Sequence, residues 1–116
     1  MRKRTRAREL ALQLLYQVDV RGDELLDDLD DILLVTGKEE EVRAFAKELV
    51  LGVVEYREEA DRLIKEVAEH WDIGRMAVVD RNVLRLAVYE MSARDDIPDK
   101  VSITEAIELG KKYSTQ

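Results

Sequence analysis

Five positively charged side chains are crowded into the first eight residues of the chain. They are Arg2, Lys3, Arg4, Arg6 and Arg8, and no acidic residue lies among them. Arginine and lysine pair with phosphate oxygens, so this cluster is suited to a phosphate-rich partner or to an acidic protein. The alternative is a short basic terminus that is simply solvated, because such termini are common.

The rest of the chain is acidic. Its 108 remaining residues carry 14 basic and 26 acidic groups, a net charge of −12. Electrostatic repulsion keeps the bulk of such a protein away from nucleic acid. Contact with nucleic acid is therefore expected only at the basic end.

An aromatic side chain follows the basic cluster on the same predicted helix, which covers about 5–18. Apolar residues at helical spacing define the core face of this helix. Leu12 and Tyr16 then point to the opposite side, with Arg8 at its edge. Arginines that meet phosphates and a tyrosine that stacks on a base are suited to single-stranded RNA. The alternative is that Leu12 and Tyr16 contact another helix.

Patterns that carry catalysis or bind metals are missing from the sequence. The chain has no cysteine, which excludes a thiol nucleophile, a disulfide and a thiolate metal site. It has no phosphate-binding glycine loop and no HExxH pattern. Its single histidine, His70, lacks the partners that a general base needs. The acidic residues between 19 and 31 lack the glycine and the terminal glutamate at the spacing of an EF-hand loop. We therefore expect no enzyme, no cofactor and no metal.

The elements that position these residues are predicted to be helices, because no strand-like alternation competes with the helical spacing. Residues 102–105 have the pattern of a capping box, and the fifth helix is apolar over most of its circumference, which favours a central position. Six helices of an all-α fold are expected: one over about 5–18, one from Asp23 to Thr36, one from about Glu39, one ending near Trp71 after a break near 56–58, one over about 75–94, and one from Ser102.

The chain length of 116 residues fits one domain. No apolar run approaches the roughly 18 residues of a membrane span, and no apolar signal-peptide core follows the basic start. We therefore expect a single cytoplasmic domain over residues 1–116, without a membrane partner.

Two long stretches resemble the NusB family of bacterial transcription antitermination factors. Residues 6–16 (RARELALQLLY) are similar to the family's opening helix. Residues 78–91 (VVDRNVLRLAVYEM) match better still, and the similarity continues through 96–98 (DIP) and 101–109 (VSITEAIEL). The order, spacing and linker lengths agree, and Trp71 lies where the family often has a tryptophan.

The resemblance implies two three-helix bundles, binding to the boxA RNA of ribosomal RNA leaders, and a heterodimer with NusE, a small-subunit ribosomal protein. It also implies action with other Nus factors on RNA polymerase, in support of ribosomal RNA transcription. It assigns RNA contact to Arg2, Lys3, Arg4, Arg6, Arg8 and Tyr16, and NusE contact to Asp80 and Arg81.

The chain departs from the family pattern after residues 111–115. Family members continue into a final helix, whereas this sequence stops at Gln116, so we expect an exposed apolar groove that favours self-association or lowers stability. Family members occur as monomers and as dimers, so a homodimer stays open. Two other interpretations also remain: an RNA-binding N-terminal domain of a ribosomal RNA cytosine methyltransferase, and a helical protein-binding adaptor that does not bind RNA.

Overall fold

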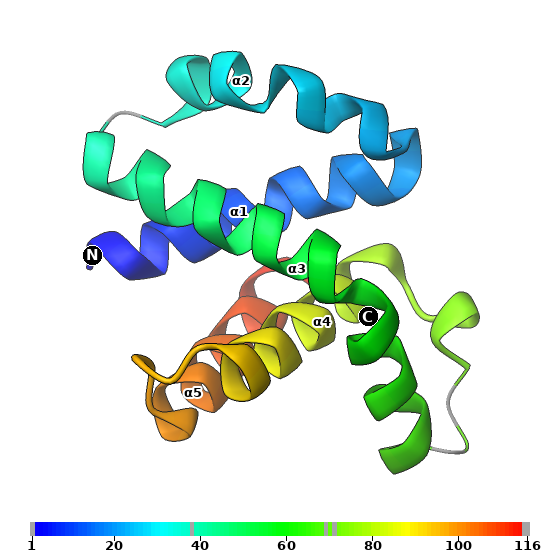
Figure 1. The fold of residues 1–116 in the computed structure, drawn as a ribbon. Coiled ribbons are helices and arrows are strands. Elements are labelled where there is room, and N and C mark those ends of the chain that lie inside the picture. The colour runs from blue at the N-terminus through cyan, green and yellow to red at the C-terminus, as the bar shows by residue number, and fades with distance from the viewer. Residues whose placement is uncertain (1, 38, 69, 71, 115–116) are drawn as a thin grey trace. The chain divides into compact units, whose positions relative to one another are not determined.

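A computed structural model describes residues 2–37, 39–68, 70 and 72–114 of the chain. Over these residues the chain forms α-helices and two short 3₁₀ helices, without a strand, which confirms the predicted all-α class. In chain order they are α1 (Lys3–Arg21), η1 (Asp23–Asp28), α2 (Leu29–Thr36), α3 (Glu40–Val67), η2 (Ile73–Arg75), α4 (Val78–Ala93) and α5 (Asp99–Tyr113) (Figure 1).

The chain divides into two compact units, Met1–Leu51 and Gly52–Gln116. The first unit contains α1, η1, α2 and the first part of α3, and the second contains the rest of α3 with η2, α4 and α5. Each unit therefore draws on three α-helices, because α3 supplies a segment to both.

A glycine ends α1. Gly22 has a φ of 105°, in the left-handed region that side chains disfavour, and its N–H donates to the Val18 carbonyl at 2.7 Å. The chain then enters η1 at Asp23, where a second helix was expected to open. That helix forms in two parts, because α2 begins only at Leu29 and ends, as predicted, at Thr36.

The third and fourth expected helices form one helix. α3 runs unbroken over Glu40–Val67, so the break predicted near 56–58 is wrong and six expected helices become five over the described residues. No proline or further glycine follows Gly52 within α3, so nothing there disfavours the helix. Tyr56 also packs on Tyr89, with ring centroids 6.2 Å apart.

The second unit is built around α4, which begins at Val78, slightly later than predicted. Arg75, where this helix was expected to begin, is instead the last residue of η2, and the carboxylate of Asp72 at the N-cap of η2 accepts the N–H of Gly74 at 2.9 Å. Leu86 is 2% exposed, in line with the central position predicted for this helix, but Met91 is 36% exposed. The described residues therefore cover α4 on most sides but not at its end.

The start of α5 differs from the sequence prediction. The helix begins at Asp99, directly after Pro98, so the capping box predicted at Ser102 is wrong. Pro98 fits this boundary because its ring fixes φ, and Asp99 places a negative charge in the first turn. Ser102 lies inside the helix and is buried, and its hydroxyl donates to Glu90 Oε1 at 2.8 Å.

Two expectations concern other parts of the chain. Trp71, expected at the end of the fourth helix, lies outside the described residues. Among the residues that are described, no helix is both long enough and apolar enough to cross a membrane.

Candidate nucleic-acid interface

The basic cluster occupies the start of α1, but its five members differ in exposure. Arg2, Lys3 and Arg4 are exposed, whereas Arg6 is half-buried. Arg8 is only 3% exposed, so its predicted place at the edge of an open face is wrong. The cluster therefore presents fewer exposed cations than its sequence suggests.

The ring of Phe45, on α3 within the same unit, lies beside two of the arginines. The guanidinium carbon of Arg4 lies 4.3 Å from the ring centroid, and that of Arg8 lies 5.5 Å from it. Cations attract the face of an aromatic ring, and the attraction grows as the pair is desolvated. Phe45 thus orders two arginines one turn apart. The sequence alone does not indicate this role of Phe45, which is the only phenylalanine in the chain.

Glu39, directly before α3, and Glu41, in its first turn, pair with two of the remaining cations. Lys3 Nζ lies 3.0 Å from Glu41 Oε1 and 3.5 Å from Glu39 Oε2, and Arg6 forms an ion pair with Glu39. The hydrogen bond and charge of Glu41, with the charge of Glu39, raise the pKa of the Lys3 ammonium group. The sequence alone does not indicate this pairing, because the glutamates lie far from these cations along the chain.

The cationic start of α1 is unfavourable for a helix. Its first turn contains no acidic residue, and Arg2 at the N-cap makes no capping hydrogen bond through its side chain. A cation near the positive end of the helix dipole destabilises the helix by about 0.3–1 kcal/mol at low ionic strength. Conflicts between local preference and the final fold occur mainly at functional sites, so the cluster is a candidate binding surface.

Tyr16 lies further along α1 and is 43% exposed, as predicted. Leu12, one turn before it, is 2% exposed, so its predicted exposure is wrong. The buried face of α1 is wider than the predicted stripe, since Arg8 and Leu12 lie one turn apart and both belong to it. The phenol ring of Tyr16 is therefore the aromatic surface that α1 offers to a ligand.

Asp80 and Arg81 lie in the first turns of α4, in the second unit, and both are half-buried. Further along α4 lie two buried polar side chains, Asn82 and Arg85, that the sequence analysis did not identify. Arg85 donates to both carboxylate oxygens of Asp61, at 2.7 and 2.9 Å, and Asn82 beside it is 2% exposed. The polar residues between the apolar positions of α4 were the sequence feature that could have indicated this buried pair.

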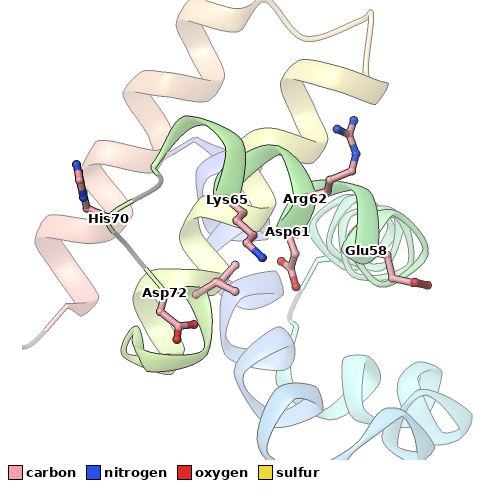
Figure 2. A pocket seen from close by; sticks show the side chains of 7 residues that line it. Glu58, Asp61, Arg62, Lys65, His70 and Asp72 are labelled. Carbon is pink, nitrogen blue, oxygen red and sulfur yellow. The ribbon is translucent and has the colours of Figure 1, made fainter.

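A pocket of about 620 Å³ opens in the second unit. Figure 2 shows Asp61 and Lys65 on the same side of α3, with the Arg62 guanidinium turned away from them. Several of its charges are already paired: Arg62 with Glu59 and Glu66, and Asp61 with Arg85. Its lining comprises Glu58, Asp61, Arg62, Lys65, His70, Asp72 and Ile73. This mixture of compensated charges points to no particular ligand. No group of three or more metal-ligating side chains occurs over the described part of the chain.

The fold and this surface define a class: a small all-α protein whose first helix carries arginines, a lysine and an exposed tyrosine. The model of the NusB family matches residues 5–116. The chain therefore belongs to the NusB family.

Relatives and solved structures agree with this assignment. The transcription antitermination protein NusB of Anaeromyxobacter dehalogenans is 50% identical over 119 residues, which cover 98% of this chain and 80% of that protein. The NusB of Symbiobacterium thermophilum is 44% identical over 97% of this chain and 78% of its own length. The structure of T. maritima NusB superposes with a TM-score of 0.85 at 38% identity, covering 97% of this chain and 80% of that one.

A structure of the antitermination factors NusB and NusE in complex with double-stranded RNA is also similar. It superposes with a TM-score of 0.84 at 31% identity and covers all of this chain and 86% of the matched one. The likeness thus extends over the whole length of the chain.

Proposed function

We propose that this chain is a transcription antitermination factor that binds boxA RNA together with NusE and supports transcription of ribosomal RNA. In this role it is a binding protein, not an enzyme, and acts in the cytoplasm with RNA polymerase. Support comes from relatives of about 50% identity that are named transcription antitermination proteins, and from a similar structure whose title describes NusB and NusE with RNA.

The observation that carries the proposal is the composition of α1. Its first turn gathers cations at the positive end of the helix dipole, where they weaken the helix, and Tyr16 lies exposed on the same helix. Phosphates neutralise such cations, and the ring of a tyrosine stacks on an unpaired base. Arg2, Lys3, Arg4 and Arg6 would meet phosphates, and Tyr16 would stack on a base.

Arg8 has a different part in this proposal. With 3% exposure and its guanidinium over Phe45, it supports the local arrangement of α1 instead of meeting phosphate directly. Asp80 and Arg81, at the start of α4, would contact NusE. Residues 1–116 would work as one RNA-binding domain.

Binding of a boxA RNA oligonucleotide, measured with and without NusE, tests the proposal. We expect the protein to bind the RNA alone and to bind it more tightly when NusE is present. A scrambled oligonucleotide of equal length is the control for sequence preference. A protein that binds neither RNA nor NusE would contradict the proposal and favour an adaptor with another partner.

A further inference from the structure

We propose that Glu39 and Glu41 compete with RNA phosphates for the cations of α1, and that they thereby set its RNA affinity and salt dependence. The inference rests on the proposed function, since it concerns the same surface. The inference adds Glu39 and Glu41 to that surface. These two acidic residues would lower the affinity for RNA.

The geometry places these carboxylates on the cations that would meet phosphate. Lys3 lies within 3.0 Å of a Glu41 oxygen and 3.5 Å of a Glu39 oxygen, and Arg6 pairs with Glu39. Figure 1 shows the N-terminal end of α1 lying beside the first turns of α3, within one unit. Of the four cations expected to meet phosphate, two are thus already neutralised within the molecule.

The pairs are open enough to be exchanged. The side chains of Lys3, Glu39 and Glu41 are 49%, 43% and 76% exposed. Exposed ion pairs contribute little to stability and are screened by salt, so a dense array of phosphates can displace the carboxylates. The released carboxylates keep a favourable electrostatic interaction, because they stay at the positive end of the α3 dipole. At Lys3 and Arg6, RNA binding then exchanges one partner for another, because each new phosphate contact replaces a contact with a carboxylate.

The residue between the two glutamates provides a matched control. Glu40 carries the same charge on the same turn of α3, but within the described residues it forms no ion pair with the cations of α1. Removing its charge changes the net charge and the local potential as a single substitution at Glu39 or Glu41 does, while leaving every pair intact.

The experiment measures RNA affinity as a function of salt for the wild type, for Glu39→Gln with Glu41→Gln, for Glu41→Gln alone, and for Glu40→Gln. The probes are a boxA RNA oligonucleotide and a scrambled one of equal length. At low salt we expect the double variant to bind both RNAs about three- to tenfold more tightly and with a steeper salt dependence. Glu40→Gln should change the affinity less than twofold. The gain should be equal for both RNAs, because phosphate contacts carry no sequence information.

The experiment distinguishes a failure of this inference from a failure of the proposed function. If the wild type binds RNA but the double variant binds no more tightly than Glu40→Gln, the glutamates position the cations and the inference is wrong. If no variant binds RNA, the proposed function fails and the inference fails with it. Melting curves identify a folding defect, and Glu41→Gln then serves alone, because the 76% exposed Glu41 side chain can lose its charge without disturbing the core.

A second measurement needs no RNA. The pairs raise the pKa of Lys3, so they lower the fraction of neutral amine that can react with an acylating reagent. We expect Lys3 to be acylated several-fold faster in the double variant and at the wild-type rate in Glu40→Gln. Equal Lys3 rates in all variants would show that the pairs do not hold Lys3 in solution, and would contradict the inference.

Discussion

Arg4 and Arg8 share one aromatic ring but differ in what they can offer a ligand. Both guanidinium groups lie over Phe45, yet Arg4 is exposed and Arg8 is 3% exposed. A buried cation over an aromatic ring contributes to stability, while an exposed one can turn outward to a phosphate. Two arginines that look equivalent in the sequence therefore have separate roles.

Substitution of each arginine by alanine separates these roles. Arg8→Ala should lower the free energy of unfolding by about 1–2 kcal/mol, because it removes a desolvated cation–aromatic contact. Arg4→Ala should leave stability within about 0.5 kcal/mol and weaken RNA binding. Chemical denaturation and RNA titration of both variants make the comparison. Equal stability of the two variants would contradict the assignment of Arg8 as a supporting residue.

Tyr16 is expected to act through its ring. Tyr16→Ala should weaken RNA binding by about 1–3 kcal/mol, the range for loss of a base–aromatic stack, with little change in melting temperature because the side chain is 43% exposed. Tyr16→Phe keeps the ring and should bind almost as well as the wild type. A large drop in melting temperature of Tyr16→Ala, with normal RNA affinity of the folded fraction, would assign Tyr16 to packing instead.

At the scale of the elements, α3 and α4 approach each other closely at Gly52. Inside α3, a Cβ at Gly52 would lie 2.2 Å from the Tyr89 hydroxyl oxygen, and the Tyr89 side chain is buried. Gly52→Ala should therefore destabilise the protein by about 1–3 kcal/mol through overpacking. Thermal unfolding measures the effect.

Gly110 in α5 is the control for this prediction. No described atom beyond its own helical surroundings lies within 4 Å of a Cβ there, so Gly110→Ala should gain about 0.5–1 kcal/mol from helix propensity. If Gly52→Ala stabilised the protein as Gly110→Ala is expected to do, Tyr89 would not be held against α3 as described.

Hydrophobic spacing predicted the helical type of the elements, because burial of an apolar stripe largely decides where helices form, but it overestimated the number of α-helices by one over the described residues. It could not resolve boundaries that depend on tertiary contacts. The unbroken course of α3 is consistent with the packing of Tyr56 on Tyr89, and Ser102 lies within α5 with its hydroxyl on Glu90. Neither partner is near in sequence, so no local pattern signals the contact.

The candidate site was predictable by residue type but not by environment. The basic cluster and the exposure of Tyr16 followed from charge and helical spacing. The guanidinium of Arg8 lies over Phe45, and Lys3 pairs with Glu41. These contacts join residues more than thirty positions apart, which periodicity within one helix cannot relate.

At the scale of the whole molecule, an acidic body carries a basic end, with a net charge of −7 for the chain. Long-range repulsion from the body opposes RNA, so binding needs the local potential of α1. A basic ribosomal protein would be attracted by the same body. Under the proposed function, RNA would meet α1 in the first unit and NusE would meet the start of α4 in the second unit.

The partner surface is tested by joint replacement of Asp80 and Arg81 with alanine. If the start of α4 meets NusE, the double variant should weaken NusE binding by about 1–2 kcal/mol, as expected when residues in an interface are truncated. RNA binding by the chain alone should stay unchanged, which is the internal control. Isothermal titration with NusE gives the result, and unaltered NusE affinity would remove these residues from the interface.

The central claim is that the cations of α1 bind RNA phosphates, and the salt dependence of RNA binding tests it most directly. About three to four phosphate contacts predict a log–log slope of roughly −2 to −3 for single-stranded RNA. Arg2→Ala with Arg4→Ala removes two cations that have no carboxylate partner among the described residues, so the slope should become shallower by about 1.4. Arg21→Ala removes one positive charge from the opposite end of the same helix and should leave the slope unchanged. An unchanged slope and affinity in the double variant would place the RNA surface elsewhere and contradict the claim.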